Sequence, residues 1–130
     1  AMRAFGMPMG PIELADTVGL DIAMAAGKQL AGRSEAPHCL QQRVDAGQLG
    51  KKSGQGFYVW SDGRPKKGSP ASIPPDLANR LIQPLIARAQ HLLANGMVQD
   101  ADLVDAGVIF GTGYAPFTGG PLNSCSKRFY

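Results

Sequence analysis

The chain has 130 residues, of which 44% are hydrophobic and 18% are charged, and its formal net charge is +3. This composition excludes a disordered chain and is typical of a soluble protein with a buried core. The small positive charge disfavours a dedicated nucleic-acid binder, and no apolar run reaches the ~20 residues of a membrane span. We therefore expect a single folded protein of short elements, since glycine (17) and proline (10) are frequent.

The first half of the chain is predicted to form short helices that begin from one fixed loop. Residues 5–14 run from an aromatic–glycine pair through a hydrophobic loop into Gly10-Pro11. Proline at a first helical position favours a helix start. The helices that we expect here span 11–18, Asp21 to Gly32, and the region of Leu40 and Val44. A turn-rich loop at 50–56 then leads into an extended arm at 57–60.

The second half is predicted to begin with a linker and to continue with a long helix. Residues 61–75 contain six glycines or prolines and no periodicity, which indicates a linker. Asp76 is expected to cap a helix that runs to about Asn95 and is kinked at Pro84. Its predicted buried stripe contains Ile82, Leu85, Ile86, Ala89 and Leu93. Asp100 is expected to cap a second helix that carries Leu103, Ala106 and Phe110, and residues 123–130 are expected to be loose.

The loop at 5–14 has a looser copy at 110–122. Both copies run from an aromatic–glycine pair through a loop with a proline to Gly-Pro, and their starts are 110 − 5 = 105 residues apart. We expect two incomplete pseudo-repeats, 1–60 and 76–122, because the first lacks a counterpart of the helix at 76–95. Each half then needs apolar partners from the other half or from another chain, which predicts intimate packing and a homodimer. The predicted fold class is all-α with one small extended arm.

Three motifs in the same order resemble one known family. They are Gly6-Met7-Pro8-Met9-Gly10-Pro11-Ile12-Glu13-Leu14-Ala15-Asp16, Lys52-Ser53-Gly54-Gln55-Gly56-Phe57-Tyr58-Val59-Trp60, and Gly111-Thr112-Gly113-Tyr114-Ala115-Pro116-Phe117-Thr118-Gly119-Gly120-Pro121-Leu122. The chain resembles the C-terminal domain of the 3-hydroxyacyl-CoA dehydrogenases. The version in bifunctional fatty-acid β-oxidation enzymes, which join enoyl-CoA hydratase and dehydrogenase on one chain, is most similar.

The resemblance implies a helical fold like the C-terminal domain of 6-phosphogluconate dehydrogenase, and a parent enzyme that oxidises L-3-hydroxyacyl-CoA with NAD. In that family, NAD and a catalytic His–Glu pair belong to a Rossmann domain, which this sequence lacks. The chain would pack on that domain or form a homodimer, and it would not be catalytic alone. The resemblance also implies a cytoplasmic lipid-metabolism enzyme whose first loop contacts acyl-CoA. The implied substrate-binding residues are Met7, Pro8, Met9, Gly10 and Pro11.

The sequence offers no catalytic, cofactor-binding or metal-binding residues of its own. The segments at 54–59 and 111–116 each lack the third glycine of a dinucleotide loop. His91 is expected on a helix surface and His38 at a loop–helix junction, neither with a catalytic role. Glu13 and Asp16 are interpreted as acidic groups that suit a helix N-terminus. Cys39 and Cys125 are expected to be free thiols, and the Asn79 amide is expected to lie on a helix surface.

Two readings stay open at this point. A basic zone could attract CoA phosphates, although a solvated loop is the simpler explanation, because such runs usually have no ligand; the zone consists of Lys51, Lys52, Arg64, Lys66 and Lys67. The alternative function is a stand-alone helical interaction or dimerisation module without enzyme activity.

Overall fold

The computed structural model describes residues 1–30, 35–69 and 72–126. Helices dominate the described residues, and the sheet found among them has two short strands, which confirms the predicted mostly-α fold with a small extended part. The chain divides into two compact units. Unit 1 consists of Ala1–Gly10 and Ser72–Tyr130, and unit 2 consists of Pro11–Ala71.

Unit 2 begins with three short helices, as the spacing of apolar residues predicts. They are α2 (Pro11–Val18), α3 (Leu20–Leu30) and α4 (His38–Asp45). Gly19 joins α2 to α3 with φ 111°, a conformation that glycine adopts without steric cost, and Leu20 is fully buried directly after it. Because α3 begins at Leu20, Asp21 lies inside its first turn and is not the capping residue before the helix. The predicted end at Gly32 lies outside the described residues.

A β-hairpin follows the 3₁₀ turn η1 (Lys51–Ser53) in unit 2. Strands β1 (Val59–Ser61) and β2 (Arg64–Lys66) pair antiparallel, with Trp60 opposite Pro65. Asp62 and Gly63 connect them with φ of 52° and 71°, the positive values that two-residue hairpin turns of the favoured hand require. The extended arm predicted at 57–60 is therefore part of a hairpin at residues 59 and 60, and the prediction of a linker is wrong for residues 61–66.

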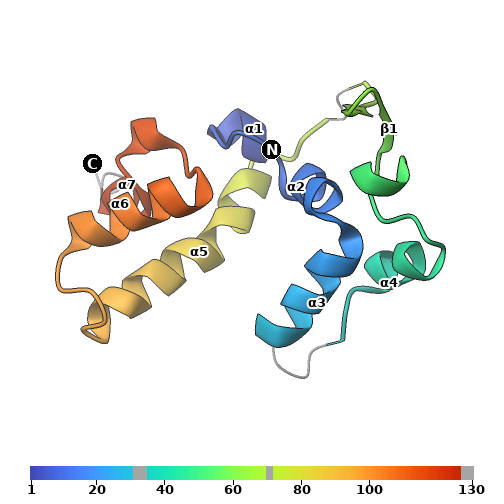
Figure 1. Ribbon diagram of the computed structural model, residues 1–130. Helices are drawn as coiled ribbons and strands as arrows, with labels where there is room; N and C mark the ends of the chain where they lie inside the picture. Colours follow the sequence, from blue (N-terminus) through green and yellow to red (C-terminus); the bar gives the residue numbers. More distant parts are fainter. Residues whose placement is uncertain (31–34, 70–71, 127–130) are drawn as a thin grey trace. The chain divides into compact units, whose positions relative to one another are not determined.

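Unit 1 is built on two long helices, α5 (Leu77–Ala94) and α6 (Ala101–Thr112), which pack against each other (Figure 1). The Asp100 side chain accepts a hydrogen bond from the Asp102 N–H at 2.9 Å, so the predicted cap of α6 is confirmed. Asp76 makes no such bond at α5 and instead lies 3.9 Å from Arg80, so its predicted capping role is wrong. Helix α5 continues through Pro84.

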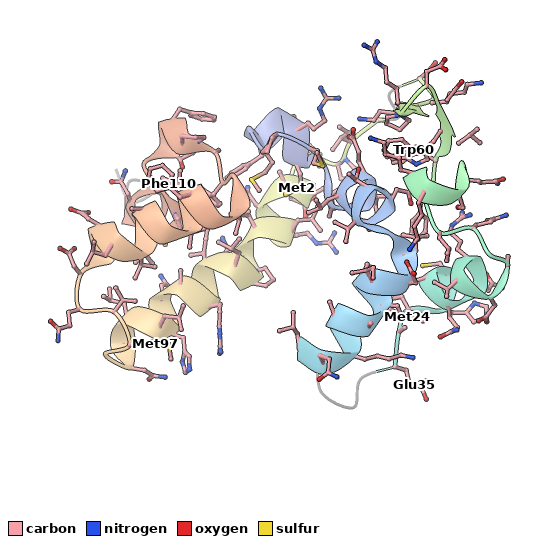
Figure 2. All side chains as sticks on the ribbon, viewed as in Figure 1. Met2, Met24, Glu35, Trp60, Met97 and Phe110 are labelled. Atoms are coloured by element: carbon pink, nitrogen blue, oxygen red, sulfur yellow. The ribbon has the colours of Figure 1, made fainter. Side chains whose placement is uncertain are left out.

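The first residues of the chain complete the core of unit 1. Helix α1 (Met2–Phe5) contacts α5, and Met2, labelled in Figure 2, is buried in this core. The other buried members are Ile82, Ile86, Tyr114 and Ala115. Residues 1–10 thus fold with the second repeat, which differs from the predicted division into 1–60 and 76–122. The apolar side chains of α1 find their partners there, as expected for a repeat whose own long helix is missing.

The described part of the chain ends in a helix at residues where a loose tail is predicted. The 3₁₀ turn η2 (Pro116–Thr118) leads into α7 (Pro121–Ser126), which packs on α5 and α6. The prediction of a loose segment is therefore wrong for residues 123–126, and residues 127–130 lie outside the described part of the chain. Six residues are too few to show helical periodicity, but Gly120-Pro121 repeats the Gly10-Pro11 helix start of α2.

Candidate functional site

The two repeated loops contact each other inside unit 1. We call residues 5–9 and 113–118 the paired loops. The Phe5 ring meets the Tyr114 ring edge-to-face, with centroids 5.6 Å apart and an interplanar angle of 74°. The Gly6 and Met7 N–H groups donate to the carbonyls of Arg3 and Met2, each at 3.0 Å. The first loop therefore has a fixed shape because both its aromatic side chain and its backbone are held.

Glycines allow the paired loops to approach closely. Gly6 has φ 112°, and a Cβ placed there would lie 2.9 Å from Cζ of Phe117 and 3.0 Å from Cβ of Ala115. At Gly113, with φ 69°, a Cβ would lie 3.0 Å from Cγ of Pro8. Any larger residue at these positions would push the loops apart and would also strain the backbone. Both glycines therefore belong to the contact between the two copies of the motif.

The five predicted substrate-binding residues do not all lie in one unit. Met7 is half-buried against the unit 1 core, Met9 is half-buried, and Pro8 is exposed. Gly10 is the last residue of this segment of unit 1, whereas Pro11 opens α2 in unit 2. Four of the five predicted residues therefore belong to unit 1 and one belongs to unit 2.

A buried aspartate in unit 1 fixes the end of the second loop. Asp105 of α6 is buried, and its two carboxylate oxygens accept the N–H groups of Leu122 and Asn123 at 2.8 and 2.9 Å. Gly120 leaves room for this carboxylate, since a Cβ there would meet the Asp105 side chain. The start of α7 is thereby tied to α6, and the loop between them is held at both ends.

A second buried aspartate has the same role in unit 2. The fully buried carboxylate of Asp16 accepts three hydrogen bonds at 2.9 Å, from Phe57 N–H, Tyr58 N–H and Trp60 Nε1 (Trp60 is labelled in Figure 2). The interpretation of Asp16 as a first-turn dipole residue is wrong, because all of these donors lie more than 40 residues further along the chain. Glu13 does lie in the first turn of α2.

Glycines of the second family-like motif fit around Asp16. A Cβ at Gly50, with φ 98°, would lie 2.7 Å from Cα of Asp16, and a Cβ at Gly56 would lie 2.7 Å from its Cγ. The segment at 50–60 thus packs closely against Asp16 of α2. This packing explains Gly50, Gly56 and the indole of Trp60, whereas a Cβ at Gly54 would meet nothing within 4 Å.

The basic zone is largely engaged within unit 2. Lys52 lies 2.7 Å from both carboxylate oxygens of Asp21, and Lys67 lies 2.5 Å from Glu13. The Lys51 ammonium lies over the Trp60 ring, 5.8 Å from its centroid. These contacts favour a structural explanation of the lysines over a CoA-phosphate site.

We expect Lys52→Met to raise the pKa of Asp21 toward its ordinary value of 3.8. The hydrogen bond from Lys52 is the main cause that holds this pKa below that value. The pair therefore stabilises the folded state above the ordinary carboxyl pKa, and this contribution is lost as the pH falls through the lowered pKa. Carboxyl-carbon NMR titration measures the effect, with Lys51→Met as the control; an Asp21 pKa that does not move in Lys52→Met would contradict the assignment.

The remaining candidates are dispersed over the described residues. His38 and His91 are exposed, with His91 bonded to Asn95 at 2.8 Å, and Asn79 is exposed on α5. Cys39 and Cys125 are free thiols. Within residues 1–30, 35–69 and 72–126, no three His, Cys, Asp or Glu side chains gather as metal ligands would. No helix in this part of the chain has the length and apolar character for a membrane crossing.

A small hollow lies between α3 and α4 in unit 2. Its volume is about 130 Å³, and none of the predicted substrate-binding residues lines it. The lining residues are Ala23, Met24, Gly27, Lys28, Glu35, Ala36, Pro37 and Leu40. The hollow is separate from the paired loops, since it belongs to the other unit.

Comparison with known proteins confirms the resemblance given by the motifs. Residues 1–60 match the family described as 3-hydroxyacyl-CoA dehydrogenase, C-terminal domain. The chain is 32% identical to the fatty acid oxidation complex subunit alpha of Ectopseudomonas oleovorans over 145 aligned positions, which cover 93% of the chain and 20% of the relative. It is 34% identical to the subunit of the same name from Vibrio cholerae, with 94% of the chain and 20% of the relative covered.

A third relative extends the same result. The fatty acid oxidation complex subunit alpha of Idiomarina loihiensis is 33% identical over 137 positions, which cover 91% of the chain and 19% of that protein. The chain thus spans about a fifth of the length of the curated relatives that it matches. The similarity includes the second repeat, beyond the 60 residues of the family match.

Proposed function

Because residues 1–60 belong to the family of 3-hydroxyacyl-CoA dehydrogenase C-terminal domains, we propose that this chain is the helical C-terminal part of an NAD-dependent 3-hydroxyacyl-CoA dehydrogenase of fatty-acid oxidation. It provides a wall of the acyl-CoA cleft and surfaces for assembly. NAD and the catalytic His–Glu pair are supplied by a Rossmann domain of the parent enzyme. The chain alone does not turn over substrate.

The contact between the paired loops is the observation that carries this proposal. A substrate wall must keep its shape when the ligand binds, and residues 5–9 are held by Tyr114, by α1 and by the second loop. The wall is apolar, and its methionines can adapt to acyl chains of different shape because thioether side chains repack at little cost. Fixed backbone and adaptable side chains together suit a cleft that accepts a series of acyl-CoA substrates.

The proposal includes the assembly and the location of the parent enzyme. We expect a homodimer or packing on the Rossmann domain, in the cytoplasm. Large apolar side chains of α6 support an assembly surface, since Leu103 and Phe110 are 63% and 89% exposed. These same side chains are what a stand-alone interaction module would present.

An assay with acetoacetyl-CoA and NADH tests the proposed division of labour. The 130-residue chain should show no NADH oxidation above the buffer rate, because the proposal assigns NAD and the catalytic His–Glu pair to the Rossmann domain of the parent enzyme. Light scattering during an acyl-CoA titration completes the test. Saturable binding of acyl-CoA supports the cleft wall, whereas self-association without any ligand effect favours the interaction module. In the NADH assay, measurable turnover would refute the claim that the redox machinery lies elsewhere.

A further inference from the structure

One aromatic side chain of unit 1 is fixed in place yet exposed. Phe117, in the 3₁₀ turn η2, is 79% exposed. Its turn is held by the N–H of Gly119 on the Pro116 carbonyl at 3.0 Å and by the Thr118 hydroxyl on the Ala115 carbonyl at 2.7 Å. The Asn123 amide adds a bond to the Thr118 carbonyl at 2.9 Å. The held turn thus presents a large apolar ring, and a ligand that buried this ring would gain hydrophobic stabilisation.

The ring of Phe117 continues the surface of the first loop. It lies against Gly6, where even a Cβ would come within 2.9 Å of its Cζ. Pro8 lies against Gly113 on the same pair of loops, and the half-buried Met7 packs against the core of unit 1. Phe117 therefore comes from the second repeat but extends the wall that the first repeat forms.

The paired loops themselves carry no charged side chain. Residues 4–12 and 106–126 contain no Asp, Glu, Lys or Arg. A ligand of this surface gains dispersion and hydrophobic contacts but no ion pair, which suits an uncharged hydrocarbon chain better than a phosphate or an acidic peptide.

We propose that Phe117 is a specificity residue that contacts the acyl chain of acyl-CoA together with Met7 and Met9. This inference rests on the proposed function, because the acyl chain is the ligand of the same wall. Long acyl chains cover more of the ring than short ones and gain more from it, because each methylene removed from water adds to the affinity. Phe117 thus favours long-chain substrates.

Photo-crosslinking of the 130-residue chain with a dodecanoyl-CoA that bears a terminal diazirine tests the contact directly. Peptide mapping should place the label on residues 7–9 and on Phe117. Binding of dodecanoyl-CoA and butyryl-CoA to Phe117→Ala provides the second measurement. We expect the variant to lose about tenfold in affinity for the long chain and less than about twofold for the short one.

Phe110→Ala is the matched control, since it removes another largely exposed phenylalanine (89%, against 79% for Phe117) that lies on α6 and outside the paired loops. Phe117→Leu should keep most of the long-chain preference, and circular dichroism verifies that each variant is folded. Label on residues 7–9 alone, with unchanged affinity in Phe117→Ala, would overturn the role of Phe117 and leave the proposed function standing. Absence of both label and saturable binding would overturn the proposed function, and this inference with it.

Discussion

Replacing Asp16 by alanine will lower the free energy of unfolding of unit 2 by about 3 kcal/mol or more. The substitution removes the acceptor of three hydrogen bonds, each made to a buried carboxylate, and leaves the N–H groups of Phe57 and Tyr58 and the indole of Trp60 without it. Bonds to charged groups contribute about 1.5–3 kcal/mol each, and the part-buried donors lose their acceptor. Urea unfolding followed by Trp60 fluorescence measures the loss, since this is the one tryptophan of the chain.

Two further variants show whether the acceptor itself is responsible. Asp16→Asn keeps the shape but presents one NH₂ group to the donors, so it should recover little of the lost stability. Asp45→Ala is the control, because that carboxylate is exposed on α4 and bonds to the Gln41 side chain; its effect should stay within about 0.5 kcal/mol. If Asp16→Asn unfolds at the same urea concentration as the parent chain, Asp16 does not hold the segment at 57–60.

Replacing Asp105 by alanine will destabilise unit 1 by about 2 kcal/mol and release the start of α7. The carboxylate holds two successive N–H groups, those of Leu122 and Asn123, in a buried position where water cannot replace it fully. Hydrogen exchange of these two amides is the direct measurement. Their protection should fall by at least about tenfold, while amides in the middle of α5 should change only as much as the global stability does.

The control for this substitution lies on the same helix. Asp102→Ala removes an exposed carboxylate from the first turn of α6 and should cost no more than about 1 kcal/mol, the usual size of a helix-dipole effect. Equal protection of the Leu122 and Asn123 amides in the Asp105→Ala and Asp102→Ala variants would contradict the role given to Asp105.

Asp16 and Asp105 make the same kind of contact in the two units. Each buried carboxylate accepts two consecutive backbone N–H groups from a later segment, and each has a glycine pressed against it, Gly56 in unit 2 and Gly120 in unit 1. A side chain on either glycine would displace the carboxylate. Gly56 and Gly120 are thus required by packing between distant segments and not solely by turns.

Elements with a strong local signal were predictable from the sequence. The helices at 11–18 and 77–94 follow from apolar spacing, and the cap of the next helix follows from Asp100. The hairpin was also within reach, because Asp62-Gly63 is a favoured two-residue turn between short strands. The number of glycines and prolines at 61–75 predicts a linker and hides this turn dipeptide.

Other features depend on contacts between distant segments and leave no local pattern. Asp16 looks like an ordinary acidic residue near a helix start, and its role becomes visible once residues 57–60 lie above it. The contact of Phe5 with Tyr114 likewise joins positions that are distant in the sequence. The sequence repeat indicates that the two loops are similar, but similarity between two segments does not predict that they contact each other.

Amide chemical-shift mapping during a titration of the isotope-labelled chain with acyl-CoA tests the central claim most directly. Our account predicts saturable shifts that concentrate on Gly6, Met7, Met9 and the second loop at 113–118, with no comparable changes along α4. Saturation confined to other residues, or an equal titration by NAD without acyl-CoA, would contradict the claim that the paired loops form an acyl-CoA wall in a chain without a redox site.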